Sequence, residues 1–220
     1  MARGFTGKSF ELLEGLAANN EREWFHAHKS DIETHLREPF AALLEALTNR
    51  LSDAPRPLMG GAKTMFRMNR DVRFSEDKSP YKTAVSGMLT ASGAKAEGGG
   101  VLYLQIDVEG GFMGSGFHML SPKQLGPFRD AMIARADEWD DVLARLDAAG
   151  RTLDGENSLT SMPRGYAEHD GHRHAASIKL KSLLLREDLP KIAWTSGDVV
   201  DRAERLARDA MPLLTFERPG

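Results

Sequence analysis

Charged side chains that could bind a ligand are concentrated between residues 63 and 82. This segment carries six basic and three acidic residues, so its net charge is +3, whereas the whole chain carries −3 and the remainder therefore −6. Arginine and lysine bind phosphate and carboxylate groups through charge-assisted hydrogen bonds. The candidate ligand-binding residues are Arg67, Asn69, Asp71, Arg73, Lys78 and Lys82. Their types predict a site for a small anionic ligand.

The same segment alternates like a β-strand, which predicts a hairpin of strands 64–74 and 81–90 with Phe74 opposite Tyr81. Arg70 would then point into the apolar face of the hairpin. A buried arginine needs a carboxylate partner, because an unpaired buried charge is strongly destabilising. We therefore expect Arg70 to be buried and ion-paired.

In this register Arg73 faces Lys82, and such a like-charge pair destabilises a hairpin unless an anion lies between the two side chains. The small side chains of Ala84 and Ser86 would leave room for that anion. The alternative is an internal network in which Asp71 and the arginines pair with one another and tie the helices to the sheet. Both interpretations remain open from the sequence.

Two residues are candidates for acid–base chemistry, although the sequence does not establish that the protein is an enzyme. Asp71 could orient the arginines or act as a base, and His118 could be a general base or a hydrogen-bonded structural residue. The run from His169 to His174 resembles a metal site by count, but it lies in a polar loop without a second ligand group at a fixed spacing. We predict no metal site and no cofactor, and the absence of cysteine excludes thiol catalysis.

The elements that would position these residues form an α+β fold. Asn20 and Glu23 fit a capping box at the start of a helix. The predicted strands are 64–74, 81–90, 101–109, 112–119 and 178–185, an antiparallel sheet of about five strands made of two hairpins and a late strand. Helices near the N-terminus, over 122–149 and over 199–214 would cover it. Residues 1–220 are expected to form a single domain.

The composition is that of a globular protein, with 41% hydrophobic and 28% charged residues. The N-terminus shows no signal-peptide pattern, and no window is apolar enough to cross a membrane. We expect a cytoplasmic protein without a membrane partner.

Three stretches resemble one known family. They are "NNEREWFHAHK" (19–29), "FRMNRDVRFSEDKSPYKT" (66–83) and "MPRGYAEHDGHRHAASIKLKSLLL" (162–185). They are similar to a bacterial and fungal family of conserved hypothetical proteins, a domain of unknown function, and the similarity runs from Phe10 to Pro212. The resemblance implies one family domain and a cytoplasmic protein, and it implies no activity.

Three classes of function are compatible with these residues. The first is binding of a small anionic ligand on the 67–82 hairpin, with or without catalysis. The second is a non-catalytic structural or interaction module whose Arg/Asp motif is an internal ion-pair network. The third is nucleic-acid binding, which the acidic remainder of the chain disfavours. Ligand identity and oligomeric state are not predicted.

Overall fold

The computed structural model describes residues 4–95 and 99–216, and within them it is an α+β fold built on one antiparallel sheet. The strands are β1 (Ala84–Thr90), β2 (Val101–Asp107), β3 (Gly110–Phe117) and β4 (Leu183–Asp188), in the order β1-β2-β3-β4. The helices are α1 (Gly7–Ala18), α2 (Arg22–Ala27), α3 (Lys29–Ile32), η1 (Glu33–Arg37), α4 (Glu38–Arg50), η2 (Ala62–Thr64), α5 (Pro122–Ala134), α6 (Ala136–Ala148), η3 (Ala167–His169), α7 (Ala175–Ile178), α8 (Lys191–Thr195), α9 (Asp198–Asp209) and α10 (Met211–Thr215).

The sheet therefore has four strands in the described residues, and the expected count of five is wrong. The expected strand 64–74 makes two isolated bridges, Met65 with Gly87 and Asn69 with Tyr81. Between those bridges and the tip of the segment, carboxylates bind backbone N–H groups: Asp71 accepts from the N–H of Arg73 at 3.3 Å, and Asp77 from that of Ser79 at 2.8 Å. Such local side-chain bonds compete with a strand ladder, so the segment bends instead of pairing.

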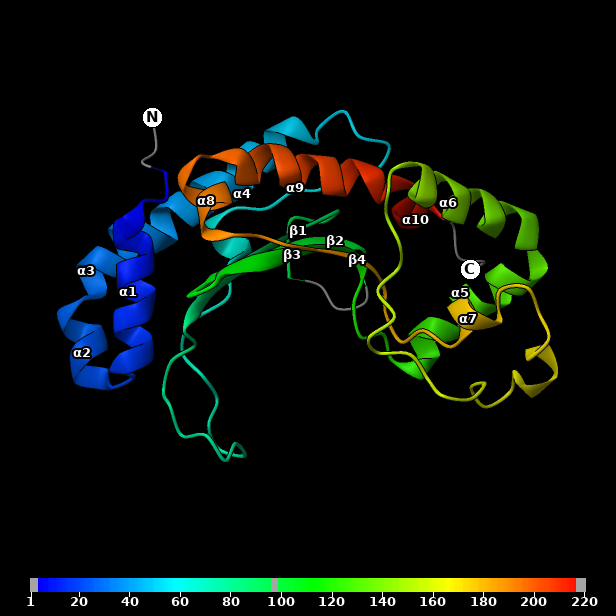
Figure 1. The fold of residues 1–220 in the computed structure, drawn as a ribbon, viewed down its shortest axis with the longest axis horizontal. Helices are drawn as coiled ribbons and strands as arrows, with labels where there is room; N and C mark the ends of the chain where they lie inside the picture. The colour runs from blue at the N-terminus through cyan, green and yellow to red at the C-terminus, as the bar shows by residue number, and fades with distance from the viewer. Residues whose placement is uncertain (1–3, 96–98, 217–220) are drawn as a thin grey trace.

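One face of the sheet is covered by helices. Leu102, Leu104 and Ile106 of β2 are fully buried because they point toward this layer. Helix α4 contacts β1, while α8, α9 and α10 contact β3, and Figure 1 shows these helices lying along the upper side of the sheet. Burial of this apolar face is the main stabilising term of the fold.

The long N-terminal helical region is interrupted by a π-helical segment, η1, before α4. The sequence predicts that the helix kinks or splits at Pro39, since proline lacks an N–H donor and clashes with the preceding turn. Pro39 lies in the first turn of α4, directly after η1. A π-helical turn is wider than an α-helical one, and such turns often mark local irregularities. The change in helix type precedes Pro39, and the helical backbone continues through this residue along α4.

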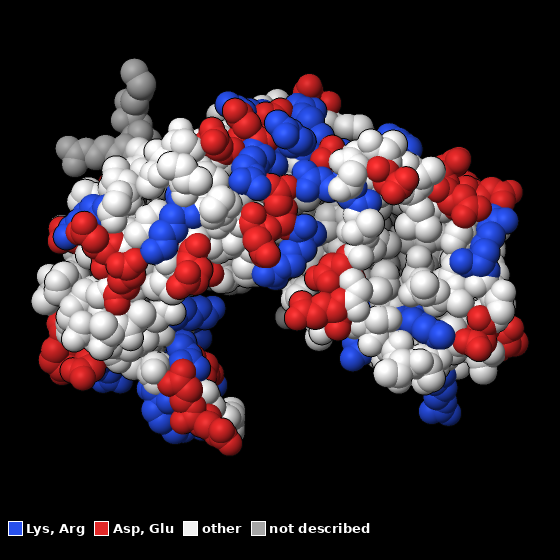
Figure 2. Space-filling model, in the orientation of Figure 1, with Lys and Arg blue, Asp and Glu red and all other residues white. Residues whose placement is uncertain are grey.

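The opposite face of the sheet is open. Tyr103, Gln105 and Asp107 of β2 alternate with the buried residues and therefore point to this side. Figures 1 and 2 show that the molecule arches over this face, with residues 66–82 on one side and the region of α5 and α7 on the other. We call residues 66–82 the arm.

No helix in the described parts of the chain has the length and apolar character required to cross a bilayer.

Candidate functional site

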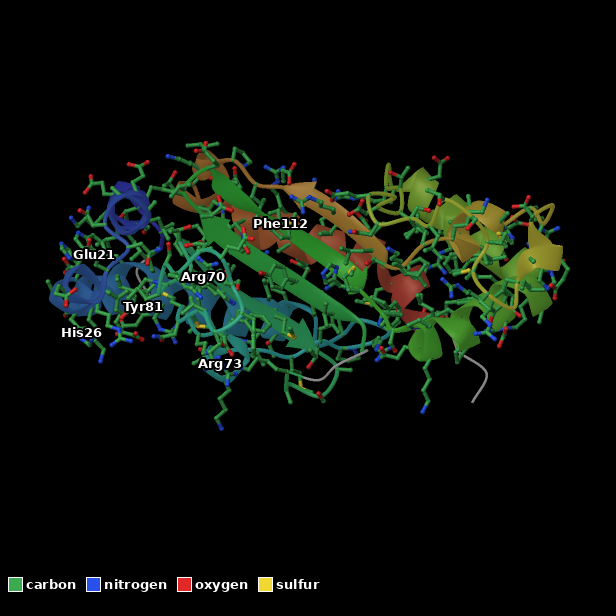
Figure 3. All side chains as sticks on the ribbon, turned by 90° about the horizontal axis from the view of Figure 1, so that it is seen from below. Glu21, His26, Arg70, Arg73, Tyr81 and Phe112 are labelled. Carbon is green, nitrogen blue, oxygen red and sulfur yellow. The ribbon has the colours of Figure 1, made fainter. Side chains whose placement is uncertain are left out.

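The six predicted ligand-binding residues all lie on the arm, and all six are exposed. Figure 3, which looks up at the open face, shows Arg70 and Arg73 on the arm and Phe112 on the sheet. None of the six lines the groove described below. These residues are Arg67, Asn69, Asp71, Arg73, Lys78 and Lys82.

The charges near the tip of the arm are paired with each other. Arg73 donates to Asp71 through Nε at 2.9 Å and Nη2 at 2.7 Å, a bidentate pair that holds the pKa of Asp71 below its usual value. Arg70 is ion-paired with Asp77. Hydrogen bonds from Ser79, and then from Arg70, lower the pKa of Asp77. The tip is thus neutralised without a ligand.

The predicted register of the arm is wrong. Asn69 pairs with Tyr81, so Phe74 lies at the tip instead of opposite Tyr81. Lys82 donates its backbone N–H to the carbonyl of Met68 at 2.7 Å and does not face Arg73. The like-charge pair that called for an anion is therefore absent from the arm.

Arg70 has the predicted carboxylate partner, Asp77, but it is not buried in an apolar face. Its side chain is 26% exposed. Because the pair is partly solvated, its loss would cost less than the loss of a fully buried pair.

The base of the arm is fixed by Asn20. Its side-chain Nδ2 donates to the carbonyl oxygen of Tyr81 at 2.9 Å, and its Oδ1 accepts from the backbone N–H of Tyr81 at 3.1 Å. The ring of Phe25 stacks on the ring of Tyr81 at 3.9 Å. Asn20 was expected to cap a helix, but Glu21 is the N-cap residue of α2. Figure 3 shows Tyr81 beside the helix that carries Glu21 and His26.

Replacing Asn20 by alanine should therefore loosen the arm. Both backbone groups of the buried Tyr81 would lose their partners, at a cost of about 2 kcal/mol. We expect the melting temperature to fall by about 4–8 °C. Asn19→Ala is the matched control, since the exposed Asn19 amide bonds the carbonyl of Gly15 in its own helix. Equal melting temperatures for the two variants would show that the Asn20 contacts do not stabilise the arm.

Phe74 at the arm tip is 96% exposed, which is unusual for an aromatic side chain. Because its ring buries almost no surface, Phe74→Ser should leave the melting temperature unchanged within about 1 °C. Met68→Ser is the matched comparison on the same arm, because Met68 is buried and its removal should lower the melting temperature by several degrees. A large fall for Phe74→Ser would mean that the arm folds back onto the protein.

A groove of about 730 Å³ lies on the open face of the sheet. Its floor is a row of three aromatic rings from three elements: Phe66 at the base of the arm, Tyr103 on β2 and Phe112 on β3. Adjacent ring centroids are 6.1 Å and 5.6 Å apart. Gly114 pairs with Tyr103 and has no side chain, so the groove is deeper between the aromatic rings and β4. Neighbouring rings are tilted to one another by 51° and 35°, so the row offers an uneven apolar surface against which a single planar ring can pack.

Tyr103 belongs to a hydrogen-bonded chain along β2. Its hydroxyl donates to Gln105 Oε1 at 2.9 Å, and Gln105 Nε2 donates to Asp107 Oδ2 at 3.1 Å. Burial raises the pKa of the Tyr103 phenol, so the hydroxyl stays protonated near neutral pH. These contacts hold the Tyr103 ring over the sheet with its hydroxyl protonated. Tyr103 is therefore better suited to packing against a ligand than to accepting a proton as a base.

Cationic groups flank the aromatic row. Lys82 Nζ and Lys95 Nζ lie 5.8 Å and 5.6 Å from the centroid of the Phe66 ring. In the described residues neither ammonium group has a carboxylate partner, although Lys95 donates to the carbonyl of Met65 at 2.9 Å. Arg186 of β4 lies 4.1 Å above the Phe112 ring and pairs with Asp188 at 3.0 Å. In the described residues, the ammonium groups without a carboxylate partner therefore lie at the Phe66 end of the aromatic row.

The two candidate catalytic residues are not brought together. His118 is exposed and lines the groove, whereas Asp71 lies on the arm in its pair with Arg73. The two were proposed as separate candidates, and the structure keeps them separate.

The histidine run is folded into a compact loop. The rings of His169 and His172 are 6.1 Å apart, and those of His172 and His174 are 5.4 Å apart. His174 is buried and bonds the carbonyl oxygen of Ala136 at 2.9 Å. Across the described residues no group of three or more histidine, aspartate or glutamate side chains is arranged to hold a metal ion.

Sequence reasoning missed several groove residues because they come from distant segments. The alternation of Tyr103, Gln105 and Asp107 was a visible signal of a polar row on one sheet face. Lys95 and Arg186 carried no such signal, since one follows β1 in a loop and the other lies on the last strand.

These features define an α+β protein whose four-stranded sheet has one face packed by helices and one face that carries an aromatic groove. The chain belongs to the DUF2461 family of conserved hypothetical proteins, whose family model matches residues 8–216. Comparison with curated proteins and with solved structures found no match.

Proposed function

We propose that this protein binds a small ligand carrying a planar ring and an anionic group in the groove on the open face of the sheet. The ring lies against Tyr103 and Phe112, and the phosphate or carboxylate lies between Lys82 and Lys95. Lys82 is the residue of the arm that contacts the anionic group of the ligand. The proposal concerns binding, and His118 is the candidate general base if the ligand also reacts.

The observation that carries the proposal is the placement of two lysines without carboxylate partners, in the described residues, at one end of an aromatic row. Each ammonium group carries a positive charge near the Phe66 ring, and an anion bound there would neutralise it. The groove volume of about 730 Å³ falls within the range of small-molecule sites. Ring stacking and charge neutralisation would then act on one ligand.

The arm supports this proposal by its placement. Asn20 and Phe25 fix Tyr81, the neighbour of Lys82, so the Lys82 backbone is held beside the sheet. Arg67, Asn69 and Lys78 lie further along the arm and remain candidates for contact with a larger ligand. Arg73 and Asp71 satisfy each other, so we give them no direct anion contact.

The test is a calorimetric titration with phenyl phosphate and phenylacetate, using cyclohexyl phosphate and inorganic phosphate as probes without an aromatic ring. We expect the aromatic anions to bind, and the non-aromatic probes to bind at least tenfold more weakly. Tyr103→Ala should remove this preference. Equal affinity for ring and non-ring probes, or no binding of any of them at millimolar concentration, would contradict the proposal.

A second candidate function is a protein-interaction module, and the exposed Phe74 ring is the observation that favours it. Exposed aromatic side chains are enriched in protein interfaces. Phe74 lies at the arm tip and not in the groove lining, so a protein partner would use a surface separate from the groove. We propose a cytoplasmic location for the protein under either candidate function.

A further inference from the structure

We infer that the groove binds the arm tip of a second copy of this chain, so that two copies exchange arms and form a two-fold symmetric dimer. Residues 70–80, which lie beyond the bridge of Asn69 with Tyr81, are the arm tip. This inference rests on the proposed function, because the arm tip carries the ring and the anionic group that the proposed ligand requires. It goes beyond that function by naming the partner.

The ring and the anionic group are Phe74 and Glu76. Phe74 is 96% exposed, whereas a buried aromatic side chain removes about 150–250 Å² from water. Asp71 and Asp77 are ion-paired with arginines of the arm, so among the described residues Glu76 is the carboxylate of the arm tip that has no ion-pair partner. A docking surface for the arm tip must therefore supply aromatic contacts and positive charge.

Contacts within the arm tip hold its shape without a partner. Besides the two ion pairs, Lys78 Nζ donates to the carbonyl oxygen of Val72 at 3.1 Å, and the backbone N–H of Ser75 donates to the same oxygen at 3.4 Å. A segment that is already ordered loses less conformational entropy when it binds. The arm tip can therefore dock as a preformed turn.

One copy does not bring its arm tip into its own groove. Figure 1 shows the arm extending away from the sheet, and the two hydrogen bonds of Asn20 to the Tyr81 backbone fix the base of the arm. The 96% exposure of Phe74 means that its ring does not reach the aromatic row. A second copy related by a two-fold axis supplies this contact in both directions, since each copy gives one arm tip and one groove.

The groove of the second copy offers both kinds of contact. Its neighbouring rings are tilted by 51° and 35°, which leaves ring faces and edges for Phe74. Lys82 and Lys95 flank the Phe66 ring at one end of the row and would form charge-assisted hydrogen bonds with Glu76. Phe74 and Glu76 are two residues apart, which separates their Cα atoms by at most about 7 Å. Adjacent ring centroids at the Phe66 end are 6.1 Å apart, a distance of the same order.

The acidic residues of the groove set the direction of docking. Asp154 and Glu156 line the groove, and the backbone N–H of Asp154 donates to the carbonyl oxygen of Leu184 on β4 at 2.7 Å, which places this loop at the β4 side. Glu76 would be repelled there, because like charges repel. The carboxylate of the arm tip therefore points to the Phe66 end.

The number of residues available fits a stable interface. The arm tip has eleven residues, and seventeen residues line the groove. Because the contact is reciprocal, each copy contributes both sets, at most 28 residues. Standard protein interfaces take about 20–30 residues from each side. A dimer closed by two arms reaches this size without any further contact.

Sedimentation velocity over a concentration series tests the dimer. We expect the unmodified protein to pass from monomer to dimer between about 1 μM and about 1 mM. Phe74→Ser should raise the dissociation constant of the dimer at least tenfold, since central aromatic side chains are typical hot spots of interfaces. Ile192→Ser is the matched control, because Ile192 is 67% exposed but lies on α8, outside the arm and the groove lining. It should change the dissociation constant less than twofold.

A mixture of two variants tests which surfaces meet. Phe74→Ser changes the arm tip and Tyr103→Ala changes the groove, so each variant alone loses both reciprocal contacts. A mixed dimer keeps one contact unchanged, between the arm tip of the Tyr103→Ala copy and the groove of the Phe74→Ser copy. The mixture should therefore associate about threefold more tightly than either variant alone. Phe112→Ala takes the place of Tyr103→Ala if the latter does not fold.

Two further results are expected because the arm tip occupies the groove. Phenyl phosphate at millimolar concentration should compete with the arm tip and shift the dimer toward monomer. In dilute protein, where the monomer prevails, Phe74→Ser and the unmodified protein should melt at the same temperature. At high concentration the unmodified protein should melt at the higher temperature, because dimerisation stabilises the native state.

Four results would overturn the inference: a monomer at every concentration, a species heavier than a dimer, a dimer that Phe74→Ser does not weaken, or a mixture of variants that associates no better than each alone. If the protein stays monomeric while phenyl phosphate binds, the proposed function holds without the dimer. If phenyl phosphate does not bind even to the monomeric Phe74→Ser variant, whose groove is free, the proposed function itself fails.

Discussion

Replacing Gly116 by valine should destabilise the protein severely. Gly116 of β3 has a φ of +137°, a conformation that side chains with a Cβ rarely adopt. A Cβ at this position would overlap the carbonyl oxygen of Leu183 on β4. Strain and overlap together should cost about 4 kcal/mol or more, a large share of the stability of a typical domain. Circular dichroism and thermal melting would measure the loss.

Gly114→Ala is the matched control for this prediction. Gly114 lies two residues earlier on the same strand, and its backbone needs no positive φ. A Cβ there would lie 3.3 Å from the carbonyl oxygen of Leu185, a tight contact that a small shift relieves. This variant should fold with a modest loss of stability. A cooperative melt for Gly116→Val near that of the unmodified protein would show that the pairing of β3 with β4 is misplaced.

Removing both lysine charges beside the Phe66 ring should have the largest effect on ligand binding. We expect Lys82→Gln/Lys95→Gln to weaken the binding of phenyl phosphate about hundredfold, because each lysine supplies a charge-assisted contact of about 1.4 kcal/mol or more. The loss should fall as salt is added, since exposed charges are screened. Calorimetry at low and at physiological ionic strength would measure both effects.

The control for the lysine pair is Lys63→Gln. Lys63 lies in the same basic segment and is exposed, but among the described contacts it is Lys82 and Lys95, not Lys63, that lie over the Phe66 ring. Its removal should change the affinity less than twofold. If Lys63→Gln weakens binding as much as the double variant, then the anion is attracted by the overall basic segment and not held at the groove.

The part of the fold around β2 and β3 could be predicted closely from the sequence. The predicted strands 101–109 and 112–119 correspond to β2 and β3, which are joined by the turn at Val108 and Glu109, and Gly110 and Gly111 at the start of β3 adopt positive φ. These signals are local, and the ladder that forms between adjacent strands satisfies them directly.

The arm could not be predicted in the same way, because contacts distant in sequence decide its shape. Alternation in 64–74 looked like a strand, yet Met68 and Tyr81 are buried against the rest of the protein without a continuous ladder. The Asn20 amide binds the backbone of Tyr81, 61 residues away, instead of capping a helix. Local capping signals do not reveal such a partner.

The groove was visible from the sequence in part. The arm lysine Lys82 was a candidate, and the strand 101–109 that carries Tyr103 was predicted, but the two were not linked. Lys95, Asp154 and Glu156 lie in loops, whose positions depend on the tertiary fold. The sequence left open whether the arm charges form a ligand site or an internal network, and the structure pairs Arg73 with Asp71 and Arg70 with Asp77.

The most direct test of ligand binding in the groove is an NMR titration of the ¹⁵N-labelled protein with phenyl phosphate. We expect the backbone amide signals of Tyr103, Gly114 and Arg186 to shift in a saturable way. Signals of Leu143, Leu153 and Ser158 should stay in place, because these residues line a separate hollow beside α6. Shifts confined to that hollow or to the arm tip, or no shift at millimolar ligand, would contradict the claim that the open sheet face is the binding site.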